Sequence, residues 1–200
     1  EAYGVLLYCN TFSAREIRVM TESEAFAKRL PPLLKKAFRI TFDRLPDGEG
    51  KYIFSIMDRD KLAAVHQTFG SDLGALALHL NFAVLEESCC RTSFLRGAFL
   101  AGGSVTDPRK GYHLELATTH QSVSRELEAL MREMELEPKA AQRKGNSVIY
   151  FKQSDRIEDF LTSIGAPVSA MEVMNAKLEK DIRGSVNRRV NCDAANLDKA

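Results

Sequence analysis

The fold is decided by residues Cys89–Leu116, CCRTSFLRGAFLAGGSVTDPRKGYHLEL, because a weaker copy opens the chain as EAYGVLLYCNTFSAREIRV over Glu1–Val19. Each copy predicts a helix that leads into a strand. A unit that recurs at a fixed spacing is typical of an internal duplication. One constant spacing pairs Gly4 with Gly97, Thr11 with Ser104 and Ser13 with Thr106.

The duplication continues along the chain, with an indel of about two residues. KYIFSIM at Lys51–Met57 matches NSVIYFK at Asn146–Lys152, and both β-branched and aromatic runs predict strands. Asp60-Lys61-Leu62 before Gly70 likewise matches Asp155-Arg156-Ile157 before Gly165. We therefore expect a first repeat at 1–70, a linker at 71–87, a second repeat at 88–166, and a C-terminal helix and linker at 167–200.

Capping and periodicity predict the individual elements. In the first repeat we expect the end of a helix over 1–10 whose start lies upstream, a strand over 15–21, a helix from the Ser23 cap to about Ala37 interrupted at Pro31-Pro32, strands over 39–44 and 51–57, and a helix over 59–69 with a Gly70 cap. In the second we expect helices over 88–101, 122–134 and 155–163 and strands over 111–118, 139–143 and 147–151, followed by a helix capped by Ser169 that ends near Gly184. The segment Ser71–Glu87 fits a strand by alternation and a helix by its alanines, and both remain open.

Composition excludes several classes of protein. With 200 residues and 44% hydrophobic content the chain can bury a large core. The apolar run Ala75–Leu85 is shorter than the roughly 20 residues of a membrane-spanning helix, so we expect no membrane partner. Four cysteines without CxxC spacing predict reduced thiols in the cytoplasm and no zinc site.

A net charge of +1 gives no global attraction to nucleic acid, so DNA binding would need local basic patches. Lys139, Arg143 and Lys144 form one candidate patch on a predicted strand and its turn. A second contains Arg183, Arg188 and Arg189 in the acid-free stretch 182–192. Ordinary solvated surface charge is the alternative for both patches.

Motifs for other chemistry fail on physical grounds. The run Gly97–Ser104 has the outline of a phosphate-binding loop, but it lacks the lysine, and a helix precedes the strand instead of following it. Close packing of Gly97 against the helix that contains Gly4 explains the glycines better. Four scattered histidines, at 66, 79, 113 and 120, show no motif that links them to a nucleophile or a metal, so we expect neither cofactor nor metal.

The helix around Gly97 resembles the LAGLIDADG helix of homing endonucleases, whose two copies pack glycine against glycine above two small sheets. FLRGAFLAGGSVTDPRKGYHLEL and the tail NRRVNCDAANLDK (187–199) are moreover similar to the WhiA family of bacterial sporulation and cell-division regulators. The resemblance covers nearly the whole chain. It implies an α+β fold of two pseudo-symmetric αββαββα-type repeats, which form a saddle of antiparallel sheets.

The same resemblance implies that cleavage is lost. The last acid of each nuclease helix holds a divalent metal, and this position corresponds to Cys9 in the first copy and Gly102 in the second. Neither residue offers the oxygen ligand that magnesium requires. Asp107 is the nearest acid, but Asp107-Pro108 is typical of a turn. We therefore expect no enzyme activity.

In the WhiA family the tail precedes a helix-turn-helix domain, which is absent from this sequence. Asn187 and Asn191, with the neighbouring arginines, could contact phosphates and bases or could fix a loop. The resemblance implies a cytoplasmic, nucleoid-associated regulator that binds DNA weakly through this part. The alternative is a module that binds a protein of the transcription or division machinery and does not contact DNA.

Overall fold

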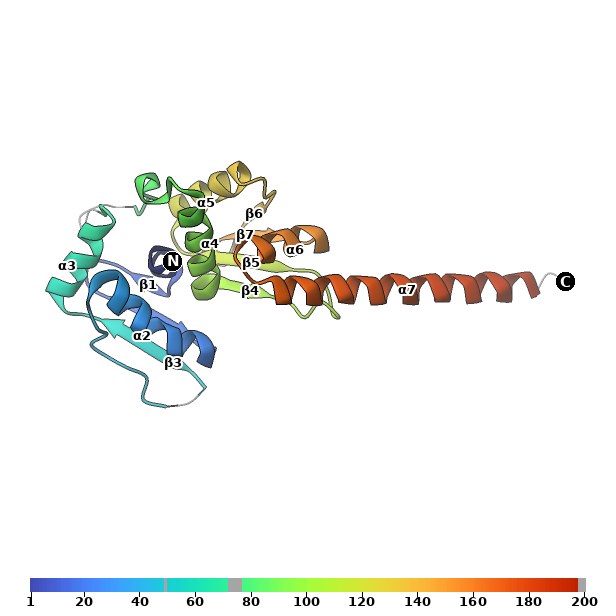
Figure 1. The fold of residues 1–200 in the computed structure, drawn as a ribbon, viewed down its shortest axis with the longest axis horizontal. Helices are drawn as coiled ribbons and strands as arrows, with labels where there is room; N and C mark the ends of the chain where they lie inside the picture. Colours follow the sequence, from blue (N-terminus) through green and yellow to red (C-terminus); the bar gives the residue numbers. More distant parts are fainter. Residues whose placement is uncertain (49, 72–76, 198–200) are drawn as a thin grey trace. The chain divides into compact units, whose positions relative to one another are not determined.

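The computed structural model describes residues 1–48, 50–71 and 77–197, with side chains described as far as Cys192. It is an α+β structure with two antiparallel sheets, as the sequence predicts (Figure 1). The chain divides into two compact units. One comprises residues 1–104 and 114–150, and the other comprises residues 105–113 and 151–200. The predicted division into repeats at 70, 87 and 166 stays a prediction.

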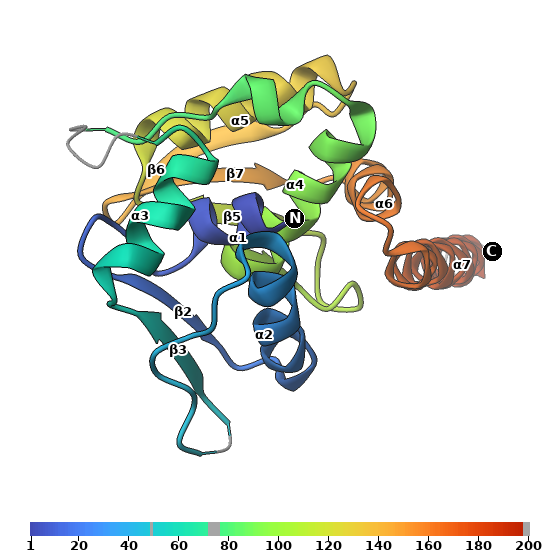
Figure 2. The same cartoon turned by 60° about the vertical axis from the view of Figure 1, so that its left-hand side comes forward.

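Two helices form the centre of the first unit. α1 (Ala2–Tyr8) packs along α4 (Ser88–Gly102), near the N-terminus in Figure 2. Every residue of α1 is buried, because it lies between α4 and the strands. The predicted helices at 1–10 and 88–101 are confirmed within a few residues.

The first sheet has the order β1-β2-β3, formed by β1 (Thr11–Phe12), β2 (Ile17–Thr21) and β3 (Tyr52–Ile56). Antiparallel pairing of Ile17 with Ile56 and Val19 with Phe54 places these apolar residues on one face. Helices α2 (Glu24–Phe38) and α3 (Arg59–Thr68) complete this half. The Ser23 hydroxyl accepts the Phe26 N–H at 3.3 Å, which confirms the predicted cap.

The second sheet has the order β4-β5-β7-β6, with β4 (Gly103–Val105), β5 (Leu114–Thr118), β6 (Lys139–Arg143) and β7 (Asn146–Phe151). Helix α5 (Gln121–Glu133) lies between β5 and β6 in the chain. Lys144 and Gly145 both have positive φ angles, 49° and 84°, as a tight two-residue hairpin requires.

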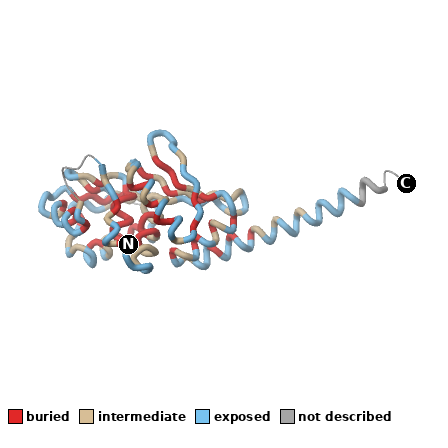
Figure 3. The backbone as a smooth tube through the Cα atoms, turned by 90° about the horizontal axis from the view of Figure 1, so that it is seen from above, coloured by how far each residue is buried: buried red, intermediate tan, exposed pale blue. Residues whose placement is uncertain are grey.

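The second unit contains α6 (Ser154–Ser163) and α7 (Pro167–Leu197), which pack against each other. Figure 3 shows that burial on α7 is confined to its first part. The prediction that this helix ends near Gly184 is wrong, and Ser169 lies inside it. A glycine inside a helix costs only about 1 kcal/mol. The helix-forming residues around Gly184 offset this cost, so α7 continues past it.

Two further predictions for the first half are wrong. Pro31 and Pro32 do not interrupt α2. Its buried face of Phe26, Ala27, Leu30 and Leu34 offsets the roughly 3 kcal/mol that an interior proline costs. The predicted strand over 39–44 is reduced to a single bridge between Arg44 and Ser55, because Arg39 ends α2 in the left-handed region.

Smaller differences concern short elements. The sequence did not predict the short strands β1 and β4, and β5 begins at Leu114 and not at Gly111. Part of the undecided segment, residues 72–76, lies outside the described residues. Phe82–Leu85 of the same segment forms a 3-10 turn, η1. Gly70, which follows the Phe69 C-cap of α3, has a φ of 63°, as a helix-ending glycine does.

Candidate functional site

The seam between α1 and α4 depends on its two glycines. A Cβ atom on Gly4 would lie 2.1 Å from the Phe94 carbonyl oxygen and 2.6 Å from the Ala98 nitrogen. A Cβ atom on Gly97 would lie 2.0 Å from the Glu1 carbonyl oxygen. Real Cβ atoms do not approach backbone this closely, so only glycine allows the two helices to pack at this distance.

Gly102 ends α4 at the position where the resemblance places a catalytic acid. A Cβ atom there would lie 2.7 Å from the Ala117 carbonyl oxygen and 3.0 Å from the Tyr8 carbonyl oxygen. Backbone from α1 and β5 thus occupies the space that a carboxylate side chain would need. A side chain at residue 102 would therefore require the backbone of α1 or β5 to move.

The corresponding residue of the first copy, Cys9, follows α1 and is buried. Its Sγ atom lies 3.0 Å from the Leu6 carbonyl oxygen and 3.1 Å from the Thr11 carbonyl oxygen. Burial raises the pKa of the Cys9 thiol to about 12, so the group is neutral at physiological pH. It is a structural thiol and neither a nucleophile nor a metal ligand.

Asp107 belongs to a turn of the second unit. Its carboxylate accepts the Arg109 N–H at 2.9 Å, and its carbonyl oxygen accepts the Lys110 N–H at 2.9 Å. The Arg109 N–H is also the main cause that lowers the pKa of Asp107. Its carboxylate is therefore used in local turn bonding. Within the described part of the chain, no group of three or more His, Cys, Asp or Glu residues is arranged to hold a metal ion.

Two of the predicted DNA-binding residues lie on one face of the second sheet. Lys139 and Arg143 pair with Tyr150 and Asn146, whereas the alternate Gln142 pairs with Ser147 beside α5. Lys139 and Arg143 therefore point away from α5, on what we call the open face of this sheet. Lys144, the third predicted residue, stands in the hairpin turn.

The open face is not purely basic. The Arg143 guanidinium donates to the Glu115 carboxylate of β5 at 3.1 Å and lies 5.4 Å from the centre of the Tyr150 ring. The sequence reasoning missed both neighbours. The alternation of Leu114 and Leu116 around Glu115 was the signal that could have placed this acid on the open face.

The first sheet carries a similar arrangement. Arg18 of β2 lies 3.4 Å from the Thr11 hydroxyl and 3.8 Å from the Glu16 carboxylate. Its neighbours Ile17 and Val19 are buried, so Arg18 points to the opposite face. The sequence reasoning did not single out Arg18, although alternation along Ile17-Arg18-Val19 indicates its direction.

The predicted tail residues do not lie in a loop. Arg183, Asn187 and Asn191 follow each other at helical spacing along α7, and Arg188 and Arg189 lie on other sides of the same helix. All five are exposed. They belong to the second compact unit, whereas Lys139 and Arg143 belong to the first. Their DNA-binding role stays a prediction.

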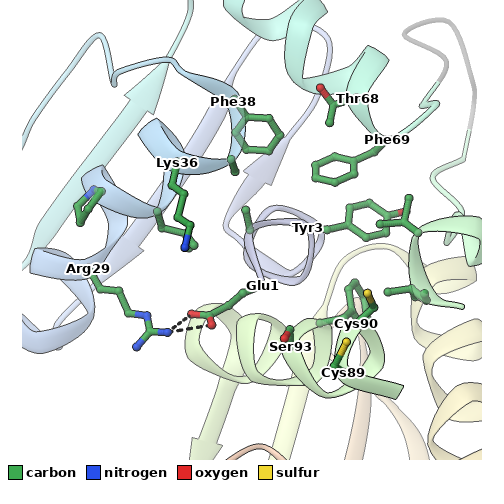
Figure 4. A pocket seen from close by; sticks show the side chains of 17 residues that line it. Glu1, Tyr3, Arg29, Lys36, Phe38, Thr68, Phe69, Cys89, Cys90 and Ser93 are labelled. Carbon is green, nitrogen blue, oxygen red and sulfur yellow. Dashed lines mark hydrogen bonds and ion pairs between the residues drawn. The ribbon is translucent and has the colours of Figure 1, made fainter. Parts of the chain in front are cut away.

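A hollow of about 710 Å³ lies among α1, α2, η1 and α4 (Figure 4). Its lining is mainly apolar, with Tyr3 stacked on Phe69 at 4.2 Å between ring centroids. At one side the Arg29 guanidinium forms an ion pair with the Glu1 carboxylate at 2.7 Å. Cys89 and Cys90 line the opposite side, and neither forms a disulfide.

No helix in the described ranges is long and apolar enough to cross a lipid bilayer. The fold matches solved structures. It superimposes with a TM-score of 0.70 on full-length DUF199/WhiA from Thermatoga maritima, at 22% identity, over 99% of this chain and 65% of that one. The homing endonuclease I-DmoI in complex with DNA and Mn matches with a TM-score of 0.57 at 12% identity, over 81% of this chain and 92% of that one. At these identities the likeness shows the LAGLIDADG fold.

The curated sequence relatives have higher sequence identity to this chain than these solved structures. A probable cell division protein WhiA from Ruminiclostridium cellulolyticum is 36% identical over all of this chain and 67% of its own length, and one from Alkaliphilus metalliredigens is 35% identical over 92% of this chain and 61% of its length. The chain thus spans about two thirds of the length of these relatives. The model of the WhiA LAGLIDADG-like domain matches residues 91–183. With its retained glycine seam and its LAGLIDADG fold, the chain belongs to the WhiA family.

Proposed function

We propose that this chain is a non-catalytic, DNA-associated domain of a bacterial regulator of cell division and sporulation, active at the nucleoid. The observation that carries the proposal is the contrast between Gly97 and Gly102. Gly97 keeps the helix seam of the LAGLIDADG scaffold, while backbone packed around Gly102 fills the place of a metal-binding acid. A scaffold kept without its reaction supports a binding role, and fold relatives such as I-DmoI are complexed with DNA.

In this proposal the open face of the second sheet contacts the phosphate backbone through Lys139 and Arg143. DNA phosphates must compete with Glu115 for the Arg143 guanidinium, so binding through this face is weak. The predicted basic residues of α7 add phosphate contacts. A helix-turn-helix domain, which the family resemblance implies for the longer protein, would read the bases.

A second candidate function is a docking module for a protein partner. The pairing of opposite charges on the two sheets favours this function, because Arg18 lies beside Glu16 and Arg143 beside Glu115. A surface of paired opposite charges and a net charge of +1 give little attraction to a polyanion. The same pattern suits a protein surface of complementary charge.

Fluorescence anisotropy with a labelled duplex, measured over a series of salt concentrations, tests the proposal. We expect a dissociation constant of roughly 10⁻⁴–10⁻⁶ M near physiological salt, as for non-specific binding. The substitutions Lys139→Ala and Arg143→Ala should each weaken binding and reduce the salt slope by about 1. Lys28→Ala, which removes an exposed lysine of α2, is the matched control and should change neither.

Glu115→Gln should change DNA affinity in the opposite direction. It removes the carboxylate that pairs with Arg143, so Arg143 can bind phosphate and binding should tighten. Nanomolar binding that is insensitive to salt would contradict the proposal. No binding at low salt would favour the protein-docking module instead.

A further inference from the structure

Strand β6 lies at one edge of the second sheet. The strand order β4-β5-β7-β6 gives it β7 as its one neighbour among the described strands. Every residue of β6 except Ala141 is exposed. An exposed edge strand presents unpaired N–H and C=O groups, to which a further strand can bond. β6 is therefore a candidate site for the addition of a strand.

The register of β6 with β7 shows which backbone groups point outward. Across the two-residue hairpin turn, Arg143 and Asn146 form the closing pair and bond to each other through their backbone groups. Bonded and non-bonded pairs alternate along an antiparallel ladder, so Ala141 also bonds to β7. Ala140 and Gln142 therefore direct their N–H and C=O groups away from β7. Among the described residues, no backbone hydrogen bond from a segment outside the sheet reaches these groups.

A hollow of about 270 Å³ lies between β6 and α5, which are neighbours in Figure 1. Ala140 and Gln142 line this hollow on the strand side, and Arg125 lines it on the helix side. Every second side chain of an added strand would point to this side of the sheet. Recognition of an extended peptide combines backbone bonds to a sheet edge with pockets for alternate side chains. The edge of β6 and the hollow beside it offer both.

Charge around the edge favours an acidic partner. Arg125 is exposed and forms no ion pair within the described part of the chain. Glu128, which also lines the hollow, is paired with an arginine one helical turn further along α5. On the open face Lys139 likewise has no ion-pair partner among the described residues, whereas Arg143 is shared with Glu115. An added strand would therefore meet an unpaired cation on each face of the sheet.

A second copy of this chain fits the edge less well. In an antiparallel pairing of two β6 strands centred on Ala141, Lys139 would face Arg143 of the partner subunit, and these like charges would repel each other. We propose that β6 binds an extended acidic peptide segment of another protein, which adds to the second sheet as a further strand with acidic side chains near Arg125 and Lys139. The proposal depends on the β6 backbone and on Arg125. It goes beyond the proposed DNA contacts, which use side chains of the open face.

Fluorescence anisotropy of the full chain with the labelled peptide Thr-Glu-Glu-Thr-Glu-Glu-Thr tests the proposal, because this probe carries glutamate on both faces of a strand. We expect a dissociation constant on the order of 100 μM, as for a few hydrogen bonds and exposed ion pairs. Arg125→Glu should weaken binding roughly fivefold. Arg59→Glu is the matched control, since Arg59 is an exposed arginine of α3, and it should leave binding unchanged. The same peptide with lysine in place of glutamate should not bind.

The backbone bonds are tested separately. Ala140→Pro removes one outward N–H group and keeps the bonds to β7, so it should weaken peptide binding roughly tenfold and leave DNA binding unchanged. In the unmodified chain, saturating peptide should slow hydrogen exchange of the Ala140 and Gln142 amides about tenfold, whereas the Ala141 amide is protected with or without peptide.

Three results would overturn the proposal. The first is the absence of binding to the acidic peptide. The second is exchange of the Ala140 and Gln142 amides that the peptide does not slow, which needs no variant to fold. The third is protection of these amides in the free chain together with a dimer in sedimentation equilibrium, which would assign the edge to a second copy.

Discussion

The glycine seam between α1 and α4 makes the sharpest prediction about stability. In Gly4→Ala the new methyl group would lie 2.1 Å from the Phe94 carbonyl oxygen and 2.6 Å from the Ala98 nitrogen. Both atoms are helix backbone and cannot rotate away, so the helices must separate by about 1 Å. Such a gap forfeits a quarter to a half of the dispersion energy of the atoms lining it. The neighbouring Leu6 and Leu95 are fully buried and would lose contacts.

We expect overpacking to cost about 3 kcal/mol, the upper part of the usual range. Alanine gains about 1 kcal/mol in helix propensity over glycine, which leaves a net loss of about 2 kcal/mol in the free energy of unfolding. For a chain of this size that lowers the melting temperature by roughly 4–8 °C. Gly97→Ala should behave in the same way, because its methyl group meets the Glu1 carbonyl oxygen.

Thermal melting followed by circular dichroism measures the effect. Gly184→Ala is the matched control: it is the same substitution within a helix, and its Cβ would meet nothing within 4 Å. It should raise the free energy of unfolding by up to about 1 kcal/mol. A melting temperature of Gly4→Ala at or above that of the unmodified chain would contradict this prediction. So would a shift of Gly4→Ala and Gly184→Ala in the same direction.

Two further predictions follow from the lost acid position and from a bonded carboxylate. The double variant Cys9→Asp, Gly102→Asp should not cleave a plasmid in magnesium, and Gly102→Asp alone should cost roughly 1–3 kcal/mol in unfolding free energy. Cleavage by the double variant would show that α1 and β5 leave room for an acid. Asp43 accepts the Met57 and Asp58 N–H groups at 2.7 and 2.8 Å and pairs with Lys61, and these bonds, that from Lys61 first, lower its pKa from 3.8 to about 2. Because the folded pKa is depressed, its stabilisation is complete above about pH 4 and is lost as the pH falls towards 2. Asp43→Asn should lower stability by about 1 kcal/mol at pH 7 and flatten the pH dependence between pH 4 and 2 in urea titrations; an unchanged acid profile would count against this assignment.

The sequence predicted those parts of the fold that depend on local periodicity and capping. The duplicated Gly4 and Gly97 indicated two helices in close contact, and the Ser23 hydroxyl caps α2 as its position before Glu24 predicts. Alternation also identified β3 and β7 within one residue of their ends. These features depend on residues within a few positions of each other, so the chain encodes them directly.

The sequence reasoning was wrong about α2 because packing outweighed a local preference, and about α7 because one unfavourable residue was given too much weight. Two prolines predict a break in α2, but burial of Leu30 and Leu34 maintains the helix. Gly184 predicts the end of α7, but α7 continues beyond it through exposed residues, because one interior glycine costs only about 1 kcal/mol. An interior proline costs about 3 kcal/mol, and burial of several large apolar side chains, at about 1.5–3 kcal/mol each, outweighs that cost.

The sequence by itself determined that residues 9 and 102, where the family resemblance implies acids in the nucleases, are cysteine and glycine, because residue identity needs no structure. Only the tertiary structure decided that Gly102 has no space for a side chain, since the obstructing oxygens belong to Tyr8 and Ala117, far away in the chain. Tertiary structure likewise paired Arg143 with Glu115 across the second sheet. The identity of a single residue is given by the sequence alone. The space around that residue and the charge of a surface depend on which distant segments folding brings together.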